Sequence, residues 1–106
     1  MLTRSADSRA PSWSWRLVVR LPADKQDEFA DAARTFLSEA PTVFSRRHVL
    51  RDITDRSLLC CVADGDEPDG LSDFLGSDAF RALRGAAETL GRVEETRVLW
   101  AHPRWR

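Results

Sequence analysis

The 106-residue sequence predicts a single α+β domain of the ferredoxin-like, split βαβ type, with a four-stranded antiparallel sheet and both helices on one face. The first observation behind this prediction is the apolar periodicity, which gives the order strand, helix, strand, strand, helix, strand. The second is size, because the 42% of hydrophobic residues suffice for one core and the length leaves no room for two. The domain is expected to span residues 13–106, after a flexible N-terminal arm at residues 1–12.

The first half of the chain predicts a strand, a helix and a second strand. Apolar residues occupy the odd positions of residues 15–21, which is the pattern of a half-buried strand that Pro22 ends. Asp24 is expected to cap a helix that runs to Pro41, with its apolar residues at helical spacing. Residues 42–53 are rich in β-branched and aromatic types but carry arginine at both odd and even positions, which favours an edge strand.

The third predicted strand, residues 57–63, determines the expected oligomeric state. Its apolar run has no polar alternation, which is expected only where both faces of a strand are covered. Two helices on one side cover only one face of the sheet. A second copy of the chain is the simplest cover for the other face, and a homodimer is therefore predicted.

The remaining elements complete the sheet. The acidic segment at residues 64–70 is expected to be a solvated loop, because its spacing does not match a calcium-binding loop, and a short helical turn follows at residues 71–75. Ser77 is a good N-cap for a second helix, which Gly91 ends. Residues 93–100 are predicted as the closing strand.

Composition argues against several classes of partner. Sixteen basic and seventeen acidic residues give a net charge of −1, so no nucleic acid is expected as a partner. The longest apolar run, residues 58–63, is far shorter than the roughly 18 residues that a membrane-spanning helix needs. No secretory signal is visible either, and the protein is expected to reside in the cytoplasm without membrane contact.

Neither a cofactor nor a metal is expected. The five glycines are scattered and form no phosphate-binding or dinucleotide-binding motif. His48 and His102 have no cysteine or glutamate at zinc-ligand spacing. Cys60 and Cys61 are adjacent, where a disulfide is geometrically poor, and are expected to be small buried residues.

Four aromatic residues are candidates for binding a substrate. Trp15 and Trp100 come from strands that are neighbours in the predicted sheet, and Phe74 and Phe80 come from the start of the second helical region. Together they are expected to wall a pocket for a planar aromatic molecule between the sheet and the helices. Plain core packing is the alternative interpretation of the same side chains.

His48 and Arg46 are the candidate catalytic residues. His48 is the only side chain of a predicted strand whose unperturbed pKa lies close to neutrality, which suits a general base. Arg46 is two positions away and so shares its strand face, where it could stabilise a phenolate. An exposed edge strand blunted by charge would need no ligand at all, and this alternative stays open.

Two segments carry a resemblance to a known family: residues 49–52 (VLRD), which precede a turn and an apolar strand, and residues 74–83 (FLGSDAFRAL). They resemble the antibiotic biosynthesis monooxygenase family, and the resemblance covers about residues 15–99. The resemblance implies a dimeric α+β barrel with a ligand cavity between sheet and helices. It also implies a cofactor-independent monooxygenase acting on an aromatic polyketide-type substrate. Haem-degrading relatives carry Asn, Trp and His at their functional positions, where this chain has Val19, Phe74 and Arg84.

Two other functions remain open. Residues 46–50 (RRHVL) also resemble the arginine-rich second strand of small polyketide cyclases that share the dimeric barrel. A non-catalytic ligand-binding homologue is the other alternative. The absence of Tyr and Asn from the chain favours the latter somewhat, since it removes two side chains that often orient substrates.

Overall fold

The computed structural model describes residues 12–39 and 44–101 and confirms the predicted α+β class. The elements in chain order are β1 (Trp13–Arg20), the 3-10 turn η1 (Ala23–Lys25), α2 (Gln26–Ser38), β2 (Phe44–Arg51), β3 (Leu58–Gly65), α3 (Pro68–Leu75), α4 (Asp78–Leu90) and β4 (Arg92–Trp100).

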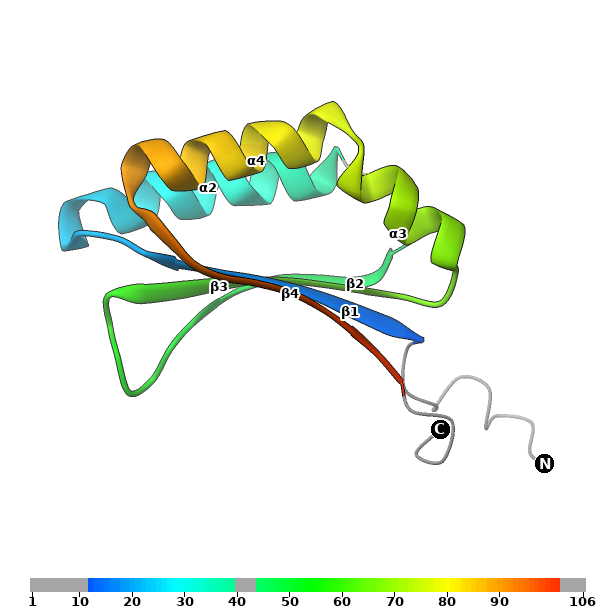
Figure 1. Cartoon of the computed structure of the whole chain (residues 1–106). Coiled ribbons are helices and arrows are strands. Elements are labelled where there is room, and N and C mark those ends of the chain that lie inside the picture. The colour runs from blue at the N-terminus through cyan, green and yellow to red at the C-terminus, as the bar shows by residue number, and fades with distance from the viewer. Residues whose placement is uncertain (1–11, 40–43, 102–106) are drawn as a thin grey trace.

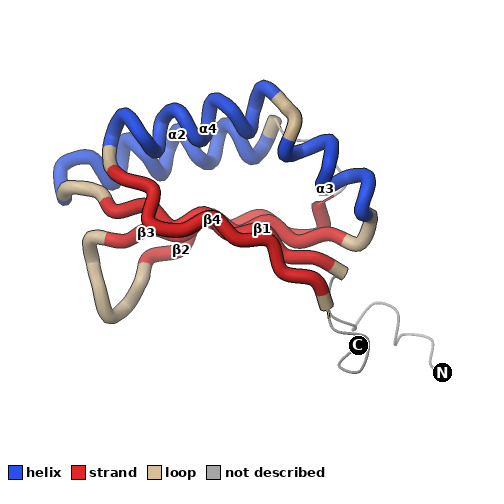
Figure 2. The backbone as a smooth tube through the Cα atoms, viewed as in Figure 1, coloured by secondary structure: helices blue, strands red, loops and turns tan. Residues whose placement is uncertain are grey.

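The four strands form one antiparallel sheet in the order β2-β3-β1-β4, so the first and last strands are neighbours, as predicted. The helices α2 and α4 run side by side across one face of this sheet, with α3 at its end (Figure 1). The same view and the tube of Figure 2 show no element over the other face among the described residues. We call these two sides the helix face and the open face.

Strand register assigns side chains to the two faces. Leu17 pairs with Cys61, and Cys61 pairs with Val49, in a row on the helix face where Leu17 and Cys61 are fully buried. One position along, Arg16 pairs with Val62, and Val62 pairs with His48, in a row on the open face. The alternation of β1 follows directly from its sequence, whose odd residues from Trp13 to Val19 are all buried.

The acidic segment differs from its predicted loop. β3 continues to Gly65, and α3 begins at Pro68, so only two residues separate strand and helix. Proline suits the first turn of a helix because its fixed φ is already helical and its missing N–H has no partner there anyway. Asp24 likewise lies in η1 rather than capping α2, whereas Ser77 caps α4 as predicted and accepts a hydrogen bond from the backbone N–H of Phe80 at 3.1 Å.

Several predictions lie wholly or largely outside the described residues. The arm predicted at residues 1–12 is described only at Ser12, and residues 102–106, with His102 and Trp105, are not described. None of the helices in the described ranges is long and apolar enough to span a membrane.

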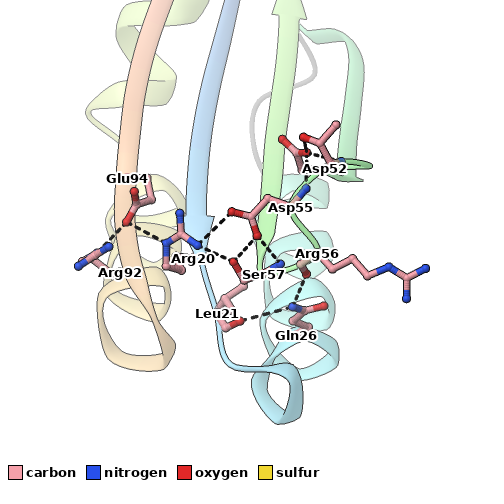
Figure 3. A network of polar contacts seen from close by, with 10 residues as sticks. Arg20, Leu21, Gln26, Asp52, Asp55, Arg56, Ser57, Arg92 and Glu94 are labelled. Carbon is pink, nitrogen blue, oxygen red and sulfur yellow. Dashed lines mark hydrogen bonds and ion pairs between the residues drawn. The ribbon is translucent and has the colours of Figure 1, made fainter.

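A polar network ties β1, β4 and the β2–β3 turn together at one end of the sheet (Figure 3). The Arg20 guanidinium donates to Asp55 Oδ2 at 3.1 Å and to Ser57 Oγ at 2.6 Å, and its Nε lies 3.4 Å from Glu94 Oε2. Arg92 Nε donates to the same Glu94 oxygen at 2.7 Å. Hydrogen bonds from Ser57, and then the Arg20 charge, lower the pKa of Asp55, and Arg92 and Arg20 lower the pKa of Glu94.

This network predicts a loss of stability in acid. A carboxylate whose folded pKa lies below its unfolded value stabilises the fold above the unfolded value, and that contribution disappears as pH falls through the folded pKa. Asp55 and Glu94 both have this sign. We therefore expect the free energy of unfolding to fall between about pH 5 and pH 2, and to fall less steeply in the Asp55→Asn variant. Denaturant titrations across that range test this, with the exposed Asp66→Asn as the control, and parallel curves for Asp55→Asn and the unmodified protein would contradict it.

Candidate functional site

Aromatic side chains gather between the helix face and the region where α3 meets α4. The Trp15 ring meets Phe74 at 5.1 Å and Phe80 at 5.7 Å between centroids, and Phe74 and Phe80 are 5.2 Å apart. All three contacts are edge-to-face, the geometry that aromatic pairs prefer. We call Trp15, Phe74 and Phe80 the aromatic cluster; Trp15 and Phe74 are fully buried, and Phe80 is partly exposed.

Phe44 extends this cluster and was not among the predicted site residues. Its ring lies 4.8 Å from Phe74 and 5.6 Å from Trp13. The register of β2 shifts between Phe44 and Arg46, so the even-numbered Phe44 is buried, whereas Arg46 is exposed. The only signal in the sequence is an aromatic residue at the start of an otherwise charged strand.

Trp100, the fourth predicted wall residue, is not enclosed by the aromatic cluster. It pairs with Trp13 across β1 and β4, but 55% of its surface is exposed. Trp13 is buried beside β3 and donates its indole N–H to the Glu67 carbonyl oxygen at 2.9 Å. The structure thus joins three of the four predicted aromatic residues and leaves Trp100 at the rim.

The candidate catalytic residues lie on the open face. His48 and Arg46 line a depression of about 520 Å³, which we call the open-face hollow. Asp64 forms part of its floor; its side chain is only 7% exposed, and its Oδ2 lies 3.3 Å from Arg46 Nη2. The lining residues are Ser14, Arg16, Arg46, His48, Leu50, Cys60, Val62 and Asp64.

This arrangement corrects the single pocket predicted from the sequence. His48 pairs with Val62 and Arg46 with Asp64 on the open face, whereas Trp15 pairs with Ala63 on the helix face. The sheet therefore separates the predicted catalytic side chains from the aromatic cluster. Their shared strand face was correctly predicted, but a ligand that contacts Trp15 lies on the other side of the sheet.

The arginines of β2 that share the helix face hold the strand against α2. Arg47 Nη1 donates to the Leu37 carbonyl oxygen at 2.8 Å, and Arg51 Nη2 donates to Gln26 Oε1 at 3.2 Å. Both bonds reach helix α2 from the edge strand. The arginine-rich character of β2 thus has a structural explanation at these two positions.

The cysteines are not activated thiols. Burial raises the pKa of Cys61 to about 12, and burial also raises the pKa of Cys60. Both therefore stay protonated near neutral pH, where the thiol is a poor nucleophile and metal ligand. Within residues 12–39 and 44–101, no three His, Cys, Asp or Glu side chains gather in a geometry that could hold a metal.

No family model matches the sequence, and no curated protein matches it. Solved structures match the fold over most of the chain. A protein of Caulobacter crescentus CB15, named a candidate antibiotic biosynthesis monooxygenase, superposes with a TM-score of 0.71 at 13% identity, over 95% of this chain and 99% of that one. A variant of SnoaB, a cofactor-independent oxygenase from Streptomyces nogalater, gives 0.65 at 19% identity, over 85% and 92%. The chain has the fold of the antibiotic biosynthesis monooxygenases.

That fold is not confined to proteins carrying the monooxygenase name. A conserved protein of unknown function from Bacteroides thetaiotaomicron, described as a possible oxidoreductase, superposes with a TM-score of 0.74 at 10% identity, over 88% of this chain and all of that one. At such identities the likeness shows the architecture, in agreement with the resemblance seen in residues 49–52 and 74–83.

Proposed function

We propose that this protein is a cofactor-independent monooxygenase that oxidises a planar aromatic, polyketide-type substrate held at the aromatic cluster. The observation that carries the proposal is the cluster itself, in which the rings meet edge to face at the sheet–helix junction and the partly exposed Phe80 reaches the surface. Planar aromatic ligands gain from stacking on such rings as well as from apolar burial. The fold shared with a protein named as a cofactor-independent oxygenase supports the same reaction class.

The proposed reaction balances without a cofactor. The methylene carbon of an anthrone loses both hydrogens and gains one oxygen atom of O₂ as a carbonyl, and the second oxygen atom leaves with the two hydrogens as water. The four electrons that reduce O₂ come from the two C–H bonds. The protein's task is to bind the substrate and favour its electron-rich anion in a water-poor site.

Oxygen uptake by chelator-treated protein tests this function. With an anthrone as substrate, we expect one O₂ consumed per quinone formed, above the rate of the uncatalysed oxidation. Cyclised product without oxygen consumption would instead favour the polyketide cyclase. Saturable binding without either product would favour a non-catalytic ligand-binding homologue.

His48→Ala tests which face of the sheet holds the substrate. Because His48 is on the open face, we expect the variant to retain the oxidation rate within about twofold across pH, well short of the roughly hundredfold loss typical of a missing general base. A hundredfold loss would instead assign the substrate to the open-face hollow with His48 as its base. Arg46→Gln is the companion variant, since Arg46 lines the same hollow.

We further propose that the protein is a homodimer whose subunits meet through their open faces. Apolar side chains on this face, Val18 on β1 and Leu58 and Val62 on β3, are only partly buried in the single chain, and Leu50 on β2 is 49% exposed. Exposed apolar surface of this kind favours a protein partner. A second copy would also enclose the open-face hollow.

A further inference from the structure

The indole N–H of Trp15, a member of the aromatic cluster, is a buried donor without a partner among the described residues. The residue is fully buried, yet its Nε1 has no hydrogen-bond partner among the described residues. Trp13, two residues earlier on the same strand face, donates its own indole N–H to the Glu67 carbonyl. Buried polar groups are nearly always paired, because an unmade bond leaves the full desolvation cost uncompensated. An unpaired donor at this position therefore points to a partner outside the described residues.

The surroundings of Trp15 limit what that partner is. Phe74 and Phe80 offer only ring edges and faces to Trp15. The arginines on the helix face of β2, Arg47 and Arg51, donate hydrogen bonds to residues of α2. Phe80 is the partly exposed member of the cluster, so the cluster reaches the surface at this ring. A ligand that complements these aromatic rings is planar and apolar over its own rings.

Indole chemistry limits the partner further. The indole nitrogen donates one hydrogen bond and accepts none, so its complement is an acceptor such as a carbonyl or a phenolate oxygen. A hydrogen bond to the charged form of an acid favours that form and lowers its pKa. Such a donor would raise the fraction of substrate present as the electron-rich anion without any protein base beside it.

We propose that Trp15 is the residue that recognises the substrate's ring oxygen, by donating its indole N–H to a ketone or ionised phenol on the planar aromatic molecule. This inference rests on the proposed function. It assigns Trp15 a role in orientation and in stabilising negative charge, beyond its contribution to an aromatic wall. It also identifies the oxygenated edge of the substrate as the end that points to β1.

Nuclear magnetic resonance of protein labelled with ¹⁵N at the tryptophan indoles tests the proposal on the unmodified chain. The probes are 1-naphthol and naphthalene, which share their rings and differ in the single oxygen. We expect 1-naphthol to move the Trp15 indole resonance downfield and naphthalene to leave its hydrogen-bonding state unchanged. The Trp15 signal is assigned by its magnetisation transfer to Phe74 and Phe80, so the test does not depend on any variant folding.

Trp15→Phe supplies the energetic test. This variant keeps an aromatic ring and removes the donor, and we expect it to bind 1-naphthol about tenfold more weakly while binding naphthalene within about twofold of the unmodified protein. The ultraviolet spectrum of bound naphtholate should show a higher pKa for the bound phenol in this variant. Trp100→Phe is the matched control, because Trp100 is half-exposed and outside the cluster.

The outcomes separate this inference from the proposed function. The role of Trp15 would be overturned if both probes shifted its resonance equally, or if Trp15→Phe lost equal affinity for both. Oxygen uptake on an anthrone in the same protein would leave the proposed oxygenase intact. Binding of 1-naphthol with the expected Trp15 shift, but no oxygen uptake, would retain the donor and reject the oxygenase. Binding of neither probe would reject both.

Discussion

We expect the substitution Gly91→Ala to destabilise the fold by about 1–3 kcal/mol, because α4 passes into β4 at this residue with no space for a side chain. A methyl group on Gly91 would overlap the carbonyl oxygen of Arg20 and would lie 2.8 Å from Leu21 Cδ2. The overlapping atom belongs to the backbone of the central strand, which cannot turn aside as a flexible side chain could. Part of β1 or the end of α4 must move instead.

A second glycine on the same helix provides the control. An added methyl group at Gly85, within α4, would meet nothing within 4 Å. Since glycine costs a helix interior about 0.5–1 kcal/mol relative to alanine, Gly85→Ala should stabilise the protein by roughly that amount. Urea unfolding of both variants gives the comparison. A loss of stability at Gly85 equal to that at Gly91 would contradict the close packing inferred at the α4–β4 junction.

The substitution Val62→Asp should convert the proposed dimer to a monomer. Val62 lies near the centre of the open face, and its cross-strand neighbours are Arg16 and His48. In a single chain, an aspartate there is partly exposed and has the Arg16 guanidinium on the neighbouring strand, so the monomer should fold. Inside a sheet-to-sheet interface the same carboxylate must lose its water, which costs about 3 kcal/mol or more and weakens association over a hundredfold.

Sedimentation or light scattering at micromolar concentration measures this change, with far-ultraviolet circular dichroism as the check on folding. Thr89→Asp, at an exposed position of α4 on the far side of the molecule, is the matched charge control and should leave the dimer intact. A stable monomer in the unmodified protein would reject the dimer itself. An unchanged Val62→Asp dimer would show that association uses another surface.

Local sequence signals predicted the elements whose structure depends mainly on local interactions. The alternation along β1 and the Ser77 cap of α4 are both readable from neighbouring residues, and both are confirmed. The loop predicted for the acidic segment was wrong from Pro68 onwards, because proline suits the first turn of a helix, a signal that is equally local.

The site was harder to predict because its decisive features are not local. Charged residues occupy both odd and even positions of β2, so its sequence does not show which face of the sheet each side chain is on. The face that His48 occupies follows only from the pairing of β2 with β3. The register shift between Phe44 and Arg46 then places an aromatic ring in the core against simple alternation. The unpaired Trp15 donor is a property of the assembled packing, which no spacing in the sequence reveals.

The position of β1 between β3 and β4 has a consequence during synthesis on the ribosome. Until β4 has emerged, one edge of β1 presents unpaired N–H and C=O groups along a strand whose alternate residues are large and apolar, from Trp13 to Val19. Such an edge is a template for pairing with other chains. A nascent or truncated chain that ends before Arg92 is thus expected to aggregate more readily than the full chain, and the closing strand β4 protects the central strand as well as completing the sheet.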